Sequence, residues 1–177
     1  AAALPFISYW GYPLSVSETF QQRNTRQTIS EGLEMAKRLQ ERAAESNAEL
    51  VIYISMGFGN PYGEPYHSDQ VLLIAQQLHA MGVQIISLAD TVGLATPTQI
   101  ADLVKSCRAE FSSIEWGVHL HARPEGQPEK IDAAYKSGCR RFDGAIGGHG
   151  GCPFAEDELV GNINTGSLIR YFKEQDP

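Results

Sequence analysis

Two histidines separated by one residue are the clearest candidate functional residues in this sequence. The stretch 117–126, GVHLHARPEG, sets His119 and His121 in an otherwise apolar run. Side chains two residues apart on a strand point to the same face and are separated by roughly 6.6 Å along the chain, so both imidazoles could bind one metal ion. An isolated pair of this kind is more often two histidines that face solvent. Only its place in the fold separates the two interpretations.

A glycine-rich stretch, residues 147–155 with the sequence GGHGGCPFA, offers a second site of chemistry. Its four glycines surround His149 and lead to Cys152. Their backbone entropy cost suggests a mobile loop or a close approach to a ligand, which makes Cys152 a candidate reactive thiol. A glycine-rich connection with a buried cysteine is the structural alternative. Asn162 offers an amide oxygen as a ligand, or as the cap of a helix near Thr165.

Five β-rich stretches, each followed by a helical one, must position these residues. We expect strands within residues 6–17, 49–56, 83–90, 114–121 and 139–146. A further short helix is expected over 129–136. The helix starts are marked by Thr28 with Glu31, Ser68, and Thr96 with Pro97, and the stops by Gly82 and Gly138. Alternating strands and helices with short links predict an α/β fold with one parallel sheet.

Polar residues gather at the carboxyl ends of these strands. They are Ser17, Glu18, Ser55, Ser87, Asp90, His119, His121 and the glycines from Gly147 onward. Chemistry at every strand end is typical of a (β/α)8 TIM barrel, whereas a doubly wound sheet concentrates its site at one switch point. No G-x-G-x-x-G pattern opens a first unit. We therefore expect a TIM barrel.

The chain is long enough for only part of such a barrel. Eight units occupy about 250 residues, whereas these 177 residues contain five recognisable units. We expect residues 1–177 to be a single domain, the C-terminal part of a TIM barrel, with about three units before it. The start AAALPF, which lacks an initiator methionine, fits this expectation.

The barrel changes the interpretation of the histidine pair. Alternate residues from Ile114 to Leu120 are apolar and would pack against the outer helices. His119 and His121 would then point inward at the carboxyl ends of the strands, where barrel enzymes bind their ligands. This position favours a metal site over a pair that faces solvent.

Composition and charge exclude several classes of protein. The hydrophobic share of 42% is typical of one compact domain, and no apolar run approaches the ~20 residues of a membrane span. A net charge of −7 argues against electrostatic binding to nucleic acid or an anionic membrane. Cys107, Cys139 and Cys152 are odd in number and lack paired zinc spacing, so we expect free thiols and a cytoplasmic location.

Two motifs carry a family resemblance. At VHLH, residues 118–121, and GGHGGCPFAEDELVGN, residues 147–162, the sequence resembles the 3-hydroxy-3-methylglutaryl-CoA lyases of the metal-dependent lyase and aldolase barrel superfamily. The likeness extends along nearly the whole chain and includes SVSETFQQRNT, GNPYG and SLADTVGLATP. Related synthases and aldolases share the histidine pair but not the cysteine loop. The match therefore favours a lyase reaction over a synthase or aldolase reaction.

The resemblance implies cleavage of 3-hydroxy-3-methylglutaryl-CoA into acetyl-CoA and acetoacetate, with Mg²⁺ or Mn²⁺ as the cofactor. His119, His121 and Asn162 match the family's metal ligands, Asp90 matches an active-site acid, and Cys152 matches the thiol of the catalytic loop. A further aspartate ligand and a catalytic arginine belong to the family's first strand, which is absent here. The 177-residue chain alone is therefore expected to be inactive.

Proton transfers are assigned by the same resemblance. Asp90 or His119 would remove the proton of the substrate hydroxyl, and Asp90 is preferred because His119 cannot easily act as ligand and base through one nitrogen. Cys152 would deliver a proton to the thioester enolate. The residues expected to contact substrate are Ser17, Ser55, Ser87, Gly150 and Gly151.

The chain departs from the family pattern at three positions. Ala122 stands where many relatives have an aspartate, Val51 where some have an arginine, and His149 where the loop is more often apolar. The alternative functions are a related metal-dependent aldolase or acyl-CoA condensing enzyme, and an inactive barrel fragment that binds a partner. We expect an acyl-CoA substrate, no nucleic acid or membrane partner, and a homodimer when the protein is full length.

Overall fold

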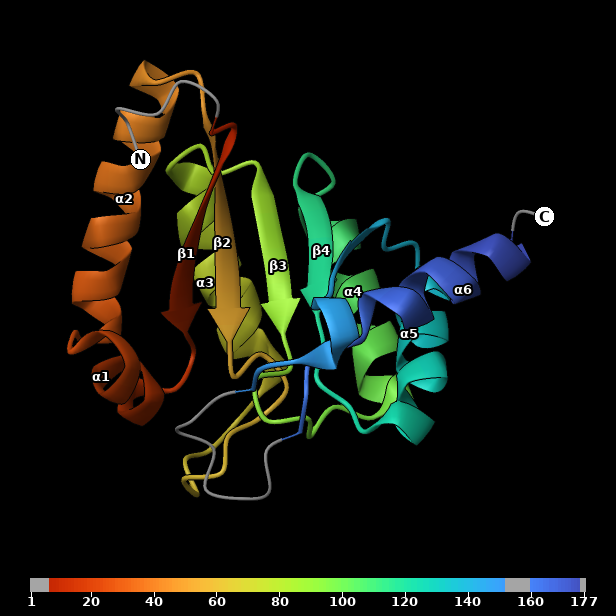
Figure 1. The fold of residues 1–177 in the computed structure, drawn as a ribbon. Coiled ribbons are helices and arrows are strands. Elements are labelled where there is room, and N and C mark those ends of the chain that lie inside the picture. The colour runs from red at the N-terminus through yellow and green to blue at the C-terminus, as the bar shows by residue number, and fades with distance from the viewer. Residues whose placement is uncertain (1–6, 152–159, 176–177) are drawn as a thin grey trace.

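The computed structural model describes residues 7–151 and 160–175. It contains five strands that form one parallel sheet in the order β1-β2-β3-β4-β5. The strands are β1 (Tyr9–Ser15), β2 (Glu49–Ser55), β3 (Ile85–Ala89), β4 (Glu115–His119) and β5 (Arg141–Asp143). All five point the same way, so their carboxyl ends meet on one side of the molecule, at the bottom of Figure 1.

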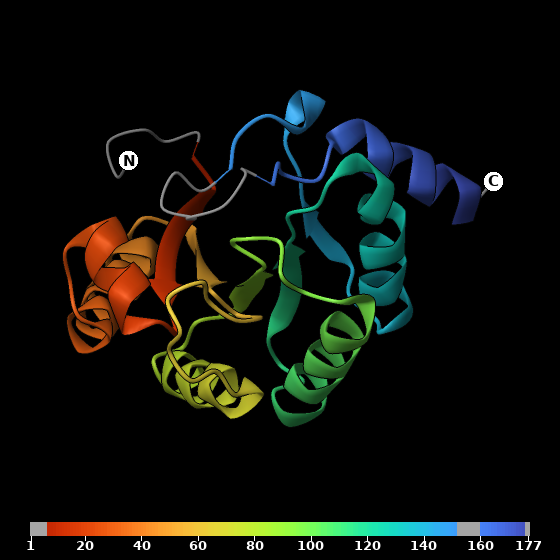
Figure 2. The ribbon, with the colours of Figure 1, turned by 90° about the horizontal axis from the view of Figure 1, so that it is seen from below.

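The helices lie on one face of this sheet. They are α1 (Glu18–Thr25), α2 (Ile29–Glu45), α3 (Ser68–Ala80), α4 (Pro97–Glu110), α5 (Gln127–Lys136) and α6 (Thr165–Gln175), with short 3-10 turns η1 (Pro124–Gly126) and η2 (Ile146–Gly148). Seen from below, the sheet is an arc whose convex side carries the helices (Figure 2). None of the described helices is long and apolar enough to cross a membrane.

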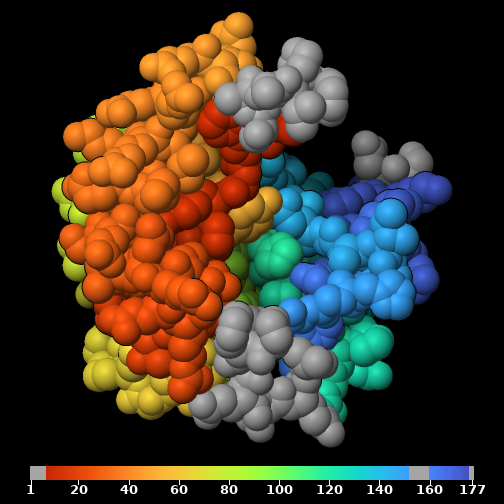
Figure 3. All heavy atoms as spheres, turned by 60° about the vertical axis from the view of Figure 1, so that its left-hand side comes forward, coloured from red at the N-terminus to blue at the C-terminus, as the bar shows by residue number. Residues whose placement is uncertain are grey.

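The strand order agrees with the barrel architecture. Each strand pairs with the next one along the chain, so the five described strands contain no switch point of the kind that a doubly wound sheet requires. The concave face of the arc is hollowed between the red N-terminal and blue C-terminal parts of the chain (Figure 3). A site on this face is therefore lined by side chains from several strands.

The core fills the space between the sheet and its helices. Strand residues such as Ile52, Leu88 and Val118 are almost completely buried and pack with helix residues such as Leu78 and Ile100. Because strand side chains alternate, the neighbouring positions on β4, Gly117 and His119, face the concave side. Burial of this apolar layer fixes the register and so decides which residues reach the hollow.

Most helix boundaries follow the expected signals. Thr28 and Thr96 both form capping boxes, and Gly82 and Gly138 have φ values of 86° and 93°, as helix-ending glycines do. The expectation for Ser68 is wrong. It is the first residue of α3, and His67 is the cap, because the Gln70 side chain accepts a hydrogen bond from the His67 backbone N–H. Helix α5 begins two residues before the expected 129.

Thr96→Ala tests the cap of α4. The Thr96 hydroxyl accepts a hydrogen bond from the Gln99 backbone N–H at 3.2 Å. Its loss should lower the free energy of unfolding by about 1 kcal/mol, measured by urea denaturation. Thr98→Ala, at an exposed position of the same helix, is the control and should change stability by less than ~0.5 kcal/mol. Equal effects of the two substitutions would show that the cap does not stabilise α4.

Candidate active site

The histidine pair lies at the carboxyl end of β4. His119 is the last residue of the strand, and its ring centroid is 5.1 Å from that of His121, with the ring planes at 86°. Nδ1 of His121 is 2.7 Å from the backbone oxygen of Asp90, which can only accept a hydrogen bond. The neutral imidazole of His121 therefore carries its proton on Nδ1, which leaves a lone pair on Nε2 for a ligand.

Asn162 is brought to the histidines by backbone pairing. It forms an antiparallel bridge with His121, and hydrogen bonds from Ile163 N to Leu120 O and from Ala122 N to Gly161 O lie on either side of it. Its Nδ2 donates to the backbone oxygen of His149 at 2.8 Å. The alternative role of Asn162 as a helix cap is wrong.

A neighbouring asparagine takes that role at the start of α6. The side-chain oxygen of Asn164 accepts a hydrogen bond from the Gly166 backbone N–H at 2.8 Å, and its backbone oxygen accepts from Ser167 and Leu168. The amide oxygen of Asn162 is buried and has no hydrogen-bond partner among the described residues. That oxygen remains available to a ligand.

A cavity of about 370 Å³ lies at the carboxyl ends of the strands. Five residues expected in the site line it: Ser55, His119, His121, Gly151 and Asn162. The remaining lining residues are Pro13, Tyr53, Ala89 and Thr91. The structure thus brings together both histidines and the asparagine at one hollow, which the sequence spacing alone could only suggest.

The donor atoms at this cavity fit a divalent cation. Among the described residues, His119 Nδ1 and Asn162 Oδ1 are buried without a hydrogen-bond partner, which is uncommon for buried polar atoms. Burial and the nearby His121 lower the pKa of His119, against the opposing effects of Asp143 and of the adjacent Asn162 side chain, so the neutral form that binds metals is favoured. Imidazole nitrogens with an amide oxygen suit Mg²⁺, Mn²⁺ or Zn²⁺. No group of three His, Cys, Asp or Glu side chains with metal-binding geometry occurs within residues 7–151 and 160–175.

Three expected site residues are engaged elsewhere. The Ser17 hydroxyl caps α1 by accepting from the Phe20 backbone N–H at 3.1 Å. Ser87 is within β3 rather than at its end, and its hydroxyl donates to Asp143 at 2.8 Å. Asp90 is 1% exposed, and it does not line the cavity. Substrate contact by Ser17 and Ser87 and proton transfer by Asp90 remain predictions that require these contacts to change.

The described part of the glycine-rich stretch approaches the site closely. Gly150 has a φ of 94°, and a Cβ atom there would lie 2.8 Å from Nδ2 of Asn162. Glycine is therefore required for both its conformation and its contact. Gly151 lines the cavity, and His149 is exposed. The expected thiol, Cys152, lies outside the described residues.

Several residues at the site were not expected from the sequence. Tyr53 meets His119 edge to face, with ring centroids 5.8 Å apart, and the Thr91 hydroxyl accepts from the Met56 backbone N–H at 2.8 Å. Asp143 is the β5 neighbour of His119 in the parallel register. Lys130 reaches Asp90 from α5. A lysine on the apolar face of a helix was the one signal in the sequence that could have identified such a contact.

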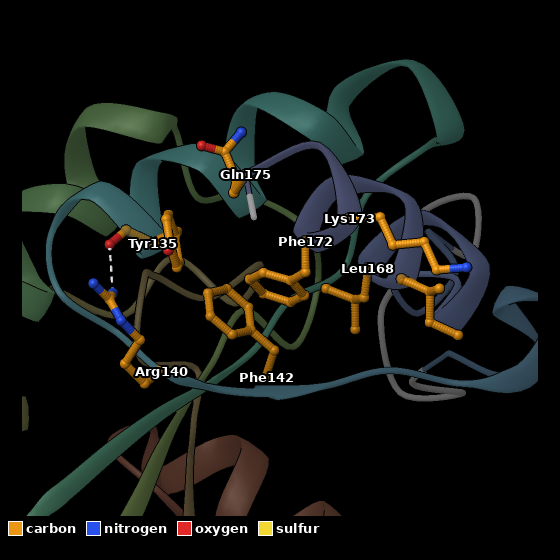
Figure 4. Close-up of a pocket in the computed structure, with 8 residues that line it drawn as sticks. Tyr135, Arg140, Phe142, Leu168, Phe172, Lys173 and Gln175 are labelled. Atoms are coloured by element: carbon orange, nitrogen blue, oxygen red, sulfur yellow. Dashed lines mark hydrogen bonds between the residues drawn. The ribbon is translucent and has the colours of Figure 1, made fainter. Parts of the chain in front are cut away.

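A second hollow, of about 670 Å³, lies away from these residues between α5, α6 and β5. Figure 4 shows Tyr135, Phe142 and Phe172 grouped in it, with Arg140 and Lys173 near its ends. Among the described residues, its lining contains no histidine and no carboxylate. The smaller cavity beside His119 is therefore the candidate active site, because it alone of these two hollows offers ligands for a cation.

Comparison with known proteins identifies relatives of the chain. It is 30% identical over 163 residues to the hydroxymethylglutaryl-CoA lyase YngG of Bacillus subtilis, with 92% of this chain and 54% of that protein covered. It is 32% identical over 159 residues to the (R)-citramalyl-CoA lyase of Chloroflexus aurantiacus, with 90% of this chain and 50% of that protein covered. The chain thus spans about half the length of these curated relatives.

Solved structures confirm the fold class. A structure of the HMG-CoA lyase from Acinetobacter baumannii, in complex with coenzyme A and 3-methylmalate, matches with a TM-score of 0.84 and 29% identity. The match covers 95% of this chain and 54% of that one. These neighbours are TIM barrels, so the five parallel strand–helix units correspond to part of such a barrel. The HMGL-like family model matches residues 12–176, and the chain therefore belongs to the HMGL-like family.

Proposed function

We propose that the natural protein is a carbon–carbon lyase that cleaves 3-hydroxy-3-methylglutaryl-CoA into acetyl-CoA and acetoacetate with the help of Mg²⁺ or Mn²⁺. The observation that carries this proposal is the convergence of His119, His121 and Asn162 at one cavity, with buried ligand atoms on His119 and Asn162 that lack a hydrogen-bond partner among the described residues. Membership of the HMGL-like family supports the reaction class.

In this proposal, His119, His121 and Asn162 hold the ion, together with ligands that these residues do not supply. When bound, a divalent ion supplies Lewis-acid polarisation of the substrate's tertiary hydroxyl and carboxylate oxygens. The hydrogen bond between His121 and the Asp90 carbonyl fixes the ring so that Nε2 is the ligand atom. The lowered pKa of His119 favours the neutral imidazole, in which one ring nitrogen has a lone pair for the ion.

The cleavage requires one base and one acid. The base removes the hydroxyl proton, the C3–C2 bond breaks as the carbonyl of acetoacetate forms, and its electron pair becomes the thioester enolate. A proton delivered to that enolate gives acetyl-CoA. We assign the second proton to Cys152 and retain Asp90 as the candidate base, with the condition that its carboxylate must then leave the ammonium of Lys130, at 2.6 Å.

A second substrate is favoured by one specific observation. The identity to the (R)-citramalyl-CoA lyase, 32%, is as high as that to the hydroxymethylglutaryl-CoA lyase, 30%. Both substrates are tertiary 3-hydroxyacyl thioesters, and citramalyl-CoA would release pyruvate in place of acetoacetate. Acyl-CoA binding, a homodimeric state of the full-length protein and a cytoplasmic location complete the proposal.

The first test is the reaction itself. The natural full-length protein with saturating Mg²⁺ or Mn²⁺ should release acetyl-CoA and acetoacetate from 3-hydroxy-3-methylglutaryl-CoA, measured by chromatography of the thioesters and a coupled assay of the acid. The 177-residue chain alone should be inactive. Pyruvate from citramalyl-CoA as the preferred product would select the second substrate. Condensation of acetyl-CoA with 2-oxo acids, with no cleavage, would refute lyase activity.

His121→Ala tests the metal ligands. Loss of one imidazole should weaken Mn²⁺ binding by at least ~100-fold, because removal of a ligand costs more than removal of its supporting contacts. Titration followed by electron paramagnetic resonance measures the dissociation constant. His79→Ala is the matched control, since His79 is an exposed histidine on the outer helix α3. Equal affinity in both variants would remove His121 from the metal site.

Cys152→Ala tests the proton donor. Turnover should fall by ~10²–10⁴-fold while Mn²⁺ affinity stays unchanged, as expected for a group that transfers a proton but does not bind the metal. Alkylation of the folded protein provides a second measure. Burial raises the pKa of Cys107 to about 12 and that of Cys139 to about 11, so neither should react near pH 7. Full activity after labelling of Cys152 would show that the thiol has no catalytic role.

A further inference from the structure

Lys130 has an unusual environment for a lysine. It belongs to the buried face of α5, with Gln127, Ile131 and Ala134, and it is only 8% exposed. Its ammonium lies 2.6 Å from Asp90 Oδ2, 2.9 Å from the backbone oxygen of His121 and 3.0 Å from that of Gly93. An ammonium has three N–H donors, so each is used by one acceptor.

These contacts form a closed ring around His121. Lys130 holds the carbonyl of His121 and the carboxylate of Asp90, while the carbonyl of Asp90 holds Nδ1 of His121 at 2.7 Å. The other carboxylate oxygen of Asp90 accepts from the Ala95 backbone N–H at 3.0 Å, and the Asp90 N–H donates to His119 O. The Lys130 ammonium therefore links the segment after β3, which contains Asp90, to the segment after β4, which contains His121.

Stability gives little reason for a lysine here. A buried ion pair must offset the loss of hydration of both charges, and apolar side chains of similar size often stabilise a protein as well or better. Ala122 follows His121, so that position supplies no carboxylate to orient the ring. Among the described residues, the hydrogen bonds of Lys130 and Asp90 hold the His121 imidazole in place.

We propose that Lys130 is a positioning residue for the metal centre. Through the carbonyl of His121 and the carboxylate of Asp90, its ammonium holds the imidazole of His121 in the tautomer that has Nδ1 protonated and Nε2 available to the ion. The metal part of this inference rests on the proposed function. In this arrangement Asp90 acts as the ion-pair partner of Lys130 and as the carbonyl acceptor for His121.

The test compares four forms of the natural full-length protein without metal. They are the wild type, Asp90→Asn, the double variant Asp90→Asn with Lys130→Met, and Lys136→Met. The double variant avoids a buried unpaired carboxylate, which Lys130→Met alone would leave and which could prevent folding. Asp90→Asn keeps the ammonium, both carbonyl acceptors and a side-chain oxygen that can still accept a hydrogen bond from the ammonium, so only the counter-charge is lost. Lys136 is on the same helix and its side chain is 70% exposed, so it controls for loss of a lysine.

The first readout is the tautomer of His121, followed by long-range proton–nitrogen spectra of protein labelled with ¹⁵N-histidine. The wild type, Asp90→Asn and Lys136→Met should show a single tautomer with Nδ1 protonated, whereas the double variant should populate both tautomers. This readout requires no metal. It therefore decides the role of Lys130 even if the wild type binds no Mn²⁺, a result that would instead refute the proposed metal site.

The second readout is the Mn²⁺ dissociation constant. This constant should rise ~10–100-fold from Asp90→Asn to the double variant, because removal of a residue that supports a metal ligand typically weakens metal binding by this factor. In Lys136→Met it should stay within about threefold of the wild-type value. A double variant that folds, keeps the wild-type tautomer and binds Mn²⁺ as Asp90→Asn does would overturn the proposal. A double variant that fails to fold while Asp90→Asn folds would also overturn it, because Lys130 would then be needed for the stability of the fold rather than for the position of His121.

Discussion

The backbone of residues 119–122 is hydrogen-bonded on both sides, and the candidate site depends on this double pairing. On one side, the Asp90 N–H donates to His119 O. On the other, Ile163 N donates to Leu120 O, and Ala122 N donates to Gly161 O. The first pairing places the histidines next to the end of β3, and the second places Asn162 opposite His121. Three segments far apart in the sequence thereby share one cavity.

The parallel sheet makes this arrangement possible. Because each strand pairs with the next, the carboxyl ends of β2, β3, β4 and β5 lie in series around the concave face. The apolar positions are held against the outer helices, so the alternate positions must face the hollow. The polar contacts near the histidines, such as that of Ser87 with Asp143, join neighbouring or next-neighbouring strands across this face. The alternation of inward-facing and outward-facing residues along the strands thus determines both the packing of the fold and the side chains that face the hollow.

More of the fold than of the candidate site could be predicted from the sequence. The alternation of strands and helices, the capping box at Thr28, the helix start at Thr96 with Pro97, and the barrel-like strand order are local or pattern-level features, and the structure agrees with them. The candidate metal ligands His119, His121 and Asn162 could be proposed from residue types and the family resemblance. The position of Lys130 on the apolar face of α5 could have signalled a buried contact, but its partner Asp90 could not be predicted, because an ion pair across 40 residues depends on how α5 packs.

In the proposed metal site, two imidazoles and one amide oxygen converge on a single divalent ion. Anomalous scattering from crystals of the natural full-length protein grown with Mn²⁺ would reveal the position of that ion. One strong peak is expected in the cavity, at ~2.0–2.6 Å from a ring nitrogen of His119, Nε2 of His121 and Oδ1 of Asn162. A Mn²⁺ peak bound elsewhere, with no anomalous density within coordination distance of these three side chains, would contradict it.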